Sequence, residues 1–192
     1  MTWIIVAVAV ALVLGLFVVL LYNRLVRLRN RAENAWAQVE VQLKRRHDLI
    51  PNLIQTVKGY AAHERSAFDS VTEARASAQQ AKSVEQQAAA ESGLTAALGR
   101  LFAVAEAYPQ LRASENFQQL QGELEETEDK IAVARQLYND AVLSYDNARE
   151  TLPTSLVAGM LSFEPRPYFE IDDRSQALPQ ADFSALPAPQ DS

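Results

Sequence analysis

The sequence predicts an all-α protein: an N-terminal transmembrane helix followed by an up-down, antiparallel helical bundle. Three observations lead to this prediction. The first 21 residues carry no charged side chain, apolar residues then recur at helical spacing, and one segment keeps alternating three- and four-residue steps for five heptads. The chain has 192 residues. We assign residues 23–170 to the bundle, which is long enough to bury a core without disulfides.

The anchor is the apolar run from Trp3 to Leu21, which has 19 residues and no charge. As a helix it rises about 28 Å, close to the hydrocarbon thickness of a bilayer. A cleaved signal peptide is the rival interpretation. However, no Lys or Arg precedes the run, and residues 22–24 form a poor cleavage site. We therefore expect residues 1–22 to be an uncleaved anchor, with Trp3 and Tyr22 at the two membrane interfaces.

Basic residues cluster beside the anchor, and acidic residues lie farther along the chain. Residues 22–65 carry nine Lys or Arg and four Asp or Glu, whereas residues 66–192 carry nine and twenty. Four arginines follow the run within ten residues and none precedes it, so the positive-inside rule predicts an outer N-terminus and a cytoplasmic bundle. The net charge of −6 argues against a nucleic-acid partner.

The membrane helix is expected to continue into the soluble part. No Gly or Pro lies between Tyr22 and Ile50, and small or apolar residues recur there at helical spacing. We expect a break at residues 46–48, where Asp48 can cap a second helix that has Pro51 in its first turn.

Three further segments follow the expected second helix, whose apolar side spans residues 50–71. Residues 76–92 are rich in Ala, Gln and Ser and are expected to be a fraying helix end or a mobile connection. A third helix is expected at residues 94–108, stopped by Pro109. Ser114 is then expected to cap a long helix.

That long helix has the most regular pattern in the chain. Its apolar face is Phe117, Leu120, Leu124, Thr127, Ile131, Ala134, Tyr138, Ala141, Tyr145, Ala148 and Leu152. This spacing predicts a left-handed, coiled-coil-like seam. Pro153 ends the helix, and residues 156–163 are expected to form a short cap over the bundle end. Residues 171–192, with prolines and acidic residues, are expected to be a disordered tail.

The side chains that usually hold metals are scarce. The chain has no cysteine and two histidines, His47 and His63. A bundle di-metal centre needs Glu-x-x-His pairs, but Lys44 and Tyr60 stand three residues before the histidines. Phosphate-binding glycine loops and hydrolase motifs are also missing. We expect no metal, no cofactor, no catalytic residue and no enzymatic activity.

One polar segment, residues 44–52, is a candidate interaction site. It contains Arg45, Arg46, Asp48 and Asn52. The functional interpretation is a recognition surface at a bundle corner. The structural interpretation, which we favour, is a helix junction where Asp48 caps one helix and an arginine contacts the carbonyls that end the other. Separately, Tyr138 lies on the seam and needs a partner for its hydroxyl.

Several stretches of the sequence resemble the LemA family. They are, in order, residues 22–26, 31–36, 43–53, Tyr108-Pro109, Asn116-Phe117, Leu120-Gln121, Glu123-Leu124, Thr127-Glu128, Ile131, Ala134-Arg135, Tyr138-Asn139, Phe163 and residues 168–170. The resemblance covers about residues 20–170. It implies a bacterial, membrane-anchored four-helix bundle of the inner membrane. It implies no established activity or cofactor.

Two functions fit these expectations. The first is a non-enzymatic scaffold or adaptor that recruits proteins at the bilayer. The alternative is a membrane-surface accessory protein with a small-ligand pocket near the junction of the first two helices. Polar groups paired locally in a solid bundle would favour the first, and polar groups around an apolar-lined hollow would favour the second. The expected partners are the lipid bilayer and unidentified proteins, with homo-oligomerisation left open.

Overall fold

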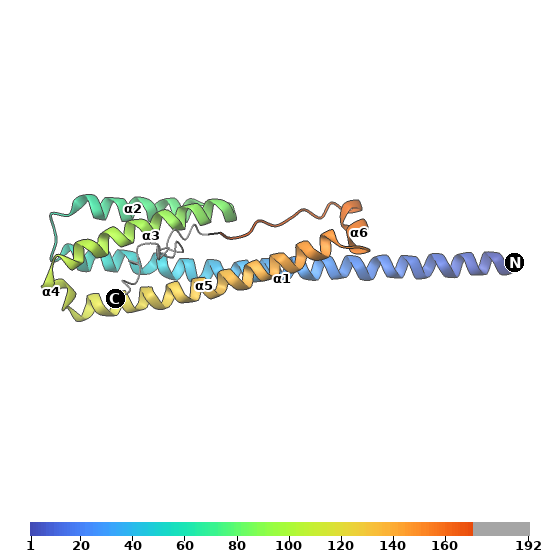
Figure 1. Ribbon diagram of the computed structural model, residues 1–192, viewed down its shortest axis with the longest axis horizontal. Helices are drawn as coiled ribbons and strands as arrows, with labels where there is room; N and C mark the ends of the chain where they lie inside the picture. Colours follow the sequence, from blue (N-terminus) through green and yellow to red (C-terminus); the bar gives the residue numbers. More distant parts are fainter. Residues whose placement is uncertain (171–192) are drawn as a thin grey trace, which may run out of the picture.

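The computed structural model describes residues 1–170, which form six helices and no strand. The helices are α1 (Thr2–Lys58), α2 (Arg65–Gln80), α3 (Val84–Glu106), α4 (Pro109–Arg112), α5 (Glu115–Glu150) and α6 (Thr154–Met160). The molecule is a long rod (Figure 1). Helix α5 runs antiparallel along α1, and the α2–α3 hairpin covers the end of α1 that lies far from the N-terminus. The predicted all-α bundle is confirmed.

Helix α1 extends well beyond the bundle at its N-terminal end. Every residue from 1 to 20 is exposed, and Leu21 is the first buried residue of the helix. By length and composition, α1 is the one helix among residues 1–170 that could cross a membrane. It continues from the apolar run into the bundle without interruption, as the absence of Gly and Pro predicted.

The predicted break at residues 46–48 is wrong, because α1 continues through Pro51 to Lys58. Proline has no N–H, so the carbonyl of His47, one turn earlier, loses its donor within the helix. The Nε of Arg75, on α2, donates a hydrogen bond to that carbonyl at 2.8 Å. A side chain from a neighbouring helix thus replaces the missing backbone donor. Asp48 is an exposed residue inside the helix and caps nothing.

The alanine-rich stretch 76–92 is also helical on both sides of a short turn, so the expected frayed or mobile segment is not found. Helix α2 continues to Gln80, and α3 begins at Val84, ten residues earlier than expected. The Oγ of Ser83 caps α3 by accepting a hydrogen bond from a backbone N–H at 3.2 Å. Ala78 and Ala88 are buried, which accounts for the small residues here.

The seam predicted for α5 forms most of its buried face. Its fully buried members are Phe117, Leu124, Thr127, Ile131, Ala134, Tyr138, Ala141, Tyr145 and Ala148. Leu120 is half-buried, and Leu152, beyond the end of the helix, is 76% exposed. Ser114 caps α5 as predicted, because its Oγ accepts a hydrogen bond from the N–H of Phe117 at 3.3 Å.

Helix α6 and the segment after it complete the end of the bundle near the apolar run. Val157 and Ala158 of α6 are buried with Leu21 and Leu25 of α1, so the expected cap is present. Residues 161–170, which we call the strap, then run back along the molecule toward the α2–α3 turn (Figure 1). Residues 171–192, expected to be a tail, lie outside the described part of the chain.

Candidate functional site

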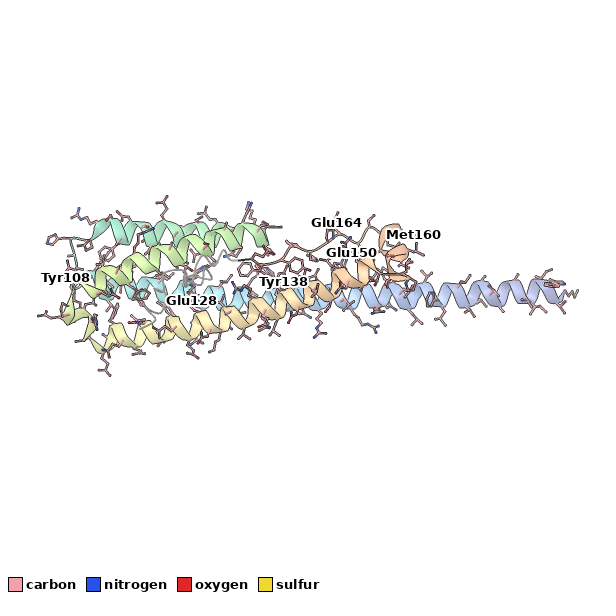
Figure 2. The ribbon with its side chains drawn as sticks, viewed as in Figure 1. Tyr108, Glu128, Tyr138, Glu150, Met160 and Glu164 are labelled. Carbon is pink, nitrogen blue, oxygen red and sulfur yellow. The ribbon has the colours of Figure 1, made fainter. Side chains whose placement is uncertain are left out.

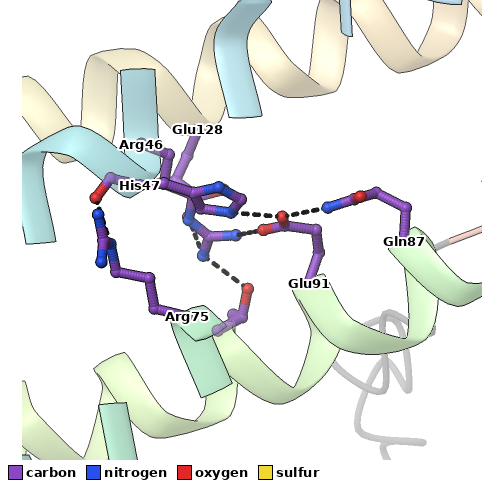
Figure 3. Close-up of polar contacts among 7 residues, drawn as sticks. Arg46, His47, Arg75, Gln87, Glu91 and Glu128 are labelled. Carbon is purple, nitrogen blue, oxygen red and sulfur yellow. Dashed lines mark hydrogen bonds and ion pairs between the residues drawn. The ribbon is translucent and has the colours of Figure 1, made fainter. Parts of the chain in front are cut away.

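A buried ion pair lies between α1 and α3. Arg46 occupies the apolar face of α1, between Leu43 and Ile50, and only 1% of it is exposed. Its Nη1 donates to Oε2 of Glu91 at 2.8 Å, and Glu91 is 0% exposed (Figure 3). Removing two charges from water is costly, so such a pair persists only where further hydrogen bonds satisfy both groups.

Further hydrogen bonds are present on both sides of the ion pair, and the buried Nε of Arg46 is left without a hydrogen-bond partner. The second carboxylate oxygen of Glu91 lies 2.7 Å from Nε2 of His47 and accepts from Gln87 at 2.8 Å. Because a carboxylate only accepts, Nε2 of His47 carries the hydrogen. The Nη2 of Arg46 donates to Thr95 at 2.7 Å and contacts Glu128 of α5 at 2.5 Å. The cluster therefore ties α1, α3 and α5 together.

The histidine and the carboxylate of this cluster are closed off from solvent. A histidine–carboxylate pair can activate a nucleophile, but the pair must then be reached by the reactants. Here Glu91 is fully buried and His47 is 6% exposed. No group of three or more potential metal-binding side chains occurs within residues 1–170. His63, the other histidine, is exposed.

The four candidate residues of the sequence do not converge on one surface. Arg46 points into the core, whereas Arg45, Asp48 and Asn52 are exposed. Successive helical residues lie about 100° apart, so Arg46 faces away from Arg45. Arg45, Asp48 and Asn52 are three and four residues apart and share one exposed face of α1. Arg45 lies 3.7 Å from the Glu126 carboxylate on α5.

Glu126 belongs to a solvent-exposed charge network on α5. A hydrogen bond from Lys130, four residues later, lowers the pKa of Glu126. The charges of Lys130 and Arg45 lower the pKa further. Exposed pairs of this kind contribute little to stability.

Glu91 was missed because its segment was expected to be a connection. A signal was nevertheless present in the sequence. Ala88, Glu91, Leu94 and Leu98 follow helical spacing, which places one carboxylate on an apolar face. Arg46 interrupts the apolar face of α1 in the same way. Opposite charges on two otherwise apolar helix faces indicate a buried pair.

The strap is held by side chains of α5. The Tyr138 hydroxyl, whose need for a partner was noted from the sequence, donates to the carbonyl of Pro167 at 2.7 Å. Asn139 exchanges two hydrogen bonds with the backbone of Phe169, at 2.9 and 3.3 Å. Tyr145 donates to the carbonyl of Glu164 at 2.8 Å. Residues 138–139 and 168–170, which are among those that resemble the LemA family, thus help to hold α5 and the strap together.

A cleft of about 360 Å³ opens beside the strap. It is lined by α1, the α2–α3 turn, α5 and the strap, and includes Trp36, Lys82, Tyr138 and Arg166. The ring of Trp36 lies 5.2 Å from that of Tyr138 and 5.3 Å from that of Phe169. Burial raises the pKa of Tyr138 to about 12.

Comparisons with known proteins agree with the resemblance noted in the sequence. A model of the LemA family matches residues 35–183. The magnetosome proteins MamQ 2 and MamQ 1 of Paramagnetospirillum magneticum are each 27% identical over 175 residues, which cover 78% of this chain and 64% of the relative. Protein LemA of Metamycoplasma hominis is 27% identical over 141 residues, covering 72% of this chain and 64% of that protein. This chain therefore spans less than two thirds of the length of these relatives. Since the family model matches most of its length, the chain belongs to the LemA family.

Proposed function

We propose that the chain is a non-enzymatic scaffold or adaptor, anchored by α1 in the inner membrane of a bacterium. The observation that carries this proposal is the continuity of α1, which joins the apolar run to the bundle without a linker. With 57 residues, α1 is about 85 Å long. An anchor built in this way holds the bundle at a fixed angle to the membrane-spanning part of α1, as a docking platform requires.

The pairing of charged groups supports a role without catalysis. Arg46 and Glu91 neutralise each other in the core, and exposed Arg45 lies beside Glu126. Charged groups that already have ion-pair partners are not held ready for a reacting ligand. This is the arrangement that the scaffold hypothesis requires.

The charge distribution around the anchor supports a cytoplasmic bundle. Arg24, Arg27, Arg29 and Arg31 follow the apolar run, and no Lys or Arg precedes Trp3. The test is a pair of reporters fused to the C-terminus, one active only in the cytoplasm and one only outside. Activity of the outer reporter alone would reverse the proposed orientation.

Crosslinking in intact membranes tests the scaffold role. A photo-crosslinking amino acid would replace Leu137 of α5 or Val41 of α1, which are 59% and 58% exposed. We expect discrete protein adducts from one or both positions. The matched control replaces Leu12 in the apolar run, where adducts should be mainly lipid. Lipid-only or absent adducts at both bundle positions would contradict a scaffold that works by direct contact.

The cleft beside the strap favours the second candidate, an accessory protein that binds a small ligand. Its mixture of aromatic and charged side chains, including Trp36, Lys82 and Arg166, is typical of ligand sites. This site lies away from the helix junction where the sequence had located it. Native mass spectrometry of the full chain in detergent distinguishes the two functions. A stoichiometric small molecule that is lost in Trp36→Ala would favour the accessory role.

A further inference from the structure

The end of the bundle nearest the apolar run exposes a group of large apolar side chains. Residues 151–163 contain no charged side chain. Within them Leu152 is 76% exposed, Leu156 64%, Met160 84% and Leu161 51%. Single exposed leucines are common, but large apolar residues exposed together within a short stretch of the chain mark a contact surface. We call these four residues the apolar tip.

The apolar tip lies at the level where the apolar run of α1 ends. The opposite face of α6 packs on Leu21 and Leu25, the last residue of the run and the first buried residue beyond it. The ring of Tyr22 meets that of Phe163 at 5.8 Å. Figure 2 shows Met160 at the end of α6 nearest the exposed half of α1. A bilayer that holds the run would therefore reach the tip.

Charge around the apolar tip complements a lipid surface. Arg24, Arg27 and Arg31 are exposed on α1 just beyond the run, where they can contact headgroup phosphates. The nearest acidic residues along the chain are Glu150, which is paired with Arg149, and Glu164. Both lie outside the uncharged stretch. Cations beside an uncharged apolar surface are the pattern of segments that lie in the membrane interface.

We propose that the apolar tip inserts into the headgroup–acyl boundary of the same bilayer that α1 crosses. This inference rests on the proposed anchoring by α1 and adds a second membrane contact, made by residues about 130 positions later in the sequence. Two contacts on different sides of one rod fix its rotation and limit its tilt. The occupant of the exposed apolar surface is lipid and not a second protein.

The absence of cysteine from the sequence allows a direct test. The full chain carrying Met160→Cys is labelled with a polarity-sensitive fluorophore and reconstituted in phosphatidylglycerol–phosphatidylcholine vesicles that contain lipid-attached quenchers. Leu137→Cys, exposed on α5 and about 22 Å farther from the membrane than Leu152, is the matched control. Leu12→Cys reports on insertion of α1. We expect a blue shift and shallow quenching at Met160, deep quenching at Leu12 and neither effect at Leu137.

The three labels separate failure of this inference from failure of the anchor. If Leu12 is quenched while Met160 matches Leu137, the second contact is refuted and the anchor stands. If Leu12 is not quenched, both are refuted. A blue shift at Met160 in the vesicles without quenching by the lipid-attached quenchers would identify protein as the occupant and overturn the proposal. Adding Leu156→Glu, at an exposed position, is expected to reduce the quenching at Met160.

Discussion

Truncation of Glu91 is expected to destabilise the bundle strongly. In Glu91→Ala, Arg46 loses its 2.8 Å partner and His47 its 2.7 Å partner, while both stay in the core. Breaking a buried ion pair by removing one member costs about 3–5 kcal/mol, because the other charge is left uncompensated. Arg46 keeps its contacts with Thr95 and Glu128, so the expected loss lies near the lower value, about 3 kcal/mol.

Removal of the whole network should cost less than removal of the carboxylate alone. The combination Arg46→Met, His47→Leu and Glu91→Leu leaves no unpaired charge in the core, because Glu128, which loses its contact with Arg46, is partly exposed. It fills the space with apolar groups. Replacements of this kind are often neutral or stabilising by about 1–4 kcal/mol. We therefore expect the triple variant to be more stable than Glu91→Ala.

The assay is thermal unfolding of the full chain in one detergent, followed by circular dichroism. A loss of about 3 kcal/mol corresponds to a fall of roughly 6–12 °C in Tm for a chain of this size. Glu125→Ala is the matched control, because Glu125 is exposed on α5 and should change stability by no more than about 0.5 kcal/mol. If Glu91→Ala unfolds at the same temperature as this control, the assignment of a buried charge network is refuted.

Two further predictions concern the hydrogen bond from Arg75 to the His47 carbonyl and the hydrogen bond from Tyr138 to the strap. Arg75→Ala should lower the free energy of unfolding by about 1.5–3 kcal/mol, because the carbonyl of His47 loses its donor. The loss should be smaller in a Pro51→Ala background, where the new backbone N–H at position 51 can donate to that carbonyl. Equal losses in both backgrounds, measured by urea unfolding, would contradict the idea that Arg75 replaces the missing backbone donor. Tyr138→Phe removes the bond to Pro167 and should cost about 1 kcal/mol. Since burial raises the pKa of Tyr138 to about 12, the unfolded phenol ionises first. The wild-type free energy of unfolding should thus fall as pH rises from about 10 through the folded pKa, and a fall of the same size in Tyr138→Phe would exclude Tyr138 as its cause.

Helical periodicity predicted the elements that depend on local spacing. The seam of α5, its cap at Ser114 and the uninterrupted start of α1 all follow from residues within a few turns of one another. Pro51 was misread for the opposite reason. Proline within a helix is tolerated only when something else satisfies the freed carbonyl, and Arg75, which does so, lies 28 residues from His47 in the sequence. A local rule has no access to that contact.

The candidate site was predicted only in part for a related reason. The polar segment around Arg46 was noticed in the sequence, but its role depends on which helix packs against it. Glu91 supplies the answer from 45 residues away. Helix spacing gives the face on which each charge lies, and the pairing of faces is decided by tertiary packing. Exposed members of the segment, such as Asp48, do not lie on an apolar helix face, so the sequence gives no indication of which residue would pair with them.

Because α1 is uninterrupted, any change in its tilt within the bilayer moves the whole bundle. Residues 22–58 extend about 55 Å beyond the apolar run. A membrane helix tilted by about 20°, an ordinary value, displaces the far end of this arm by roughly 19 Å from the position of an upright helix. Bilayer thickness alters the tilt of a span of fixed length. Since α1 has no joint between the run and the bundle, a small angular change among the lipids becomes a displacement of nanometre scale at the α2–α3 hairpin.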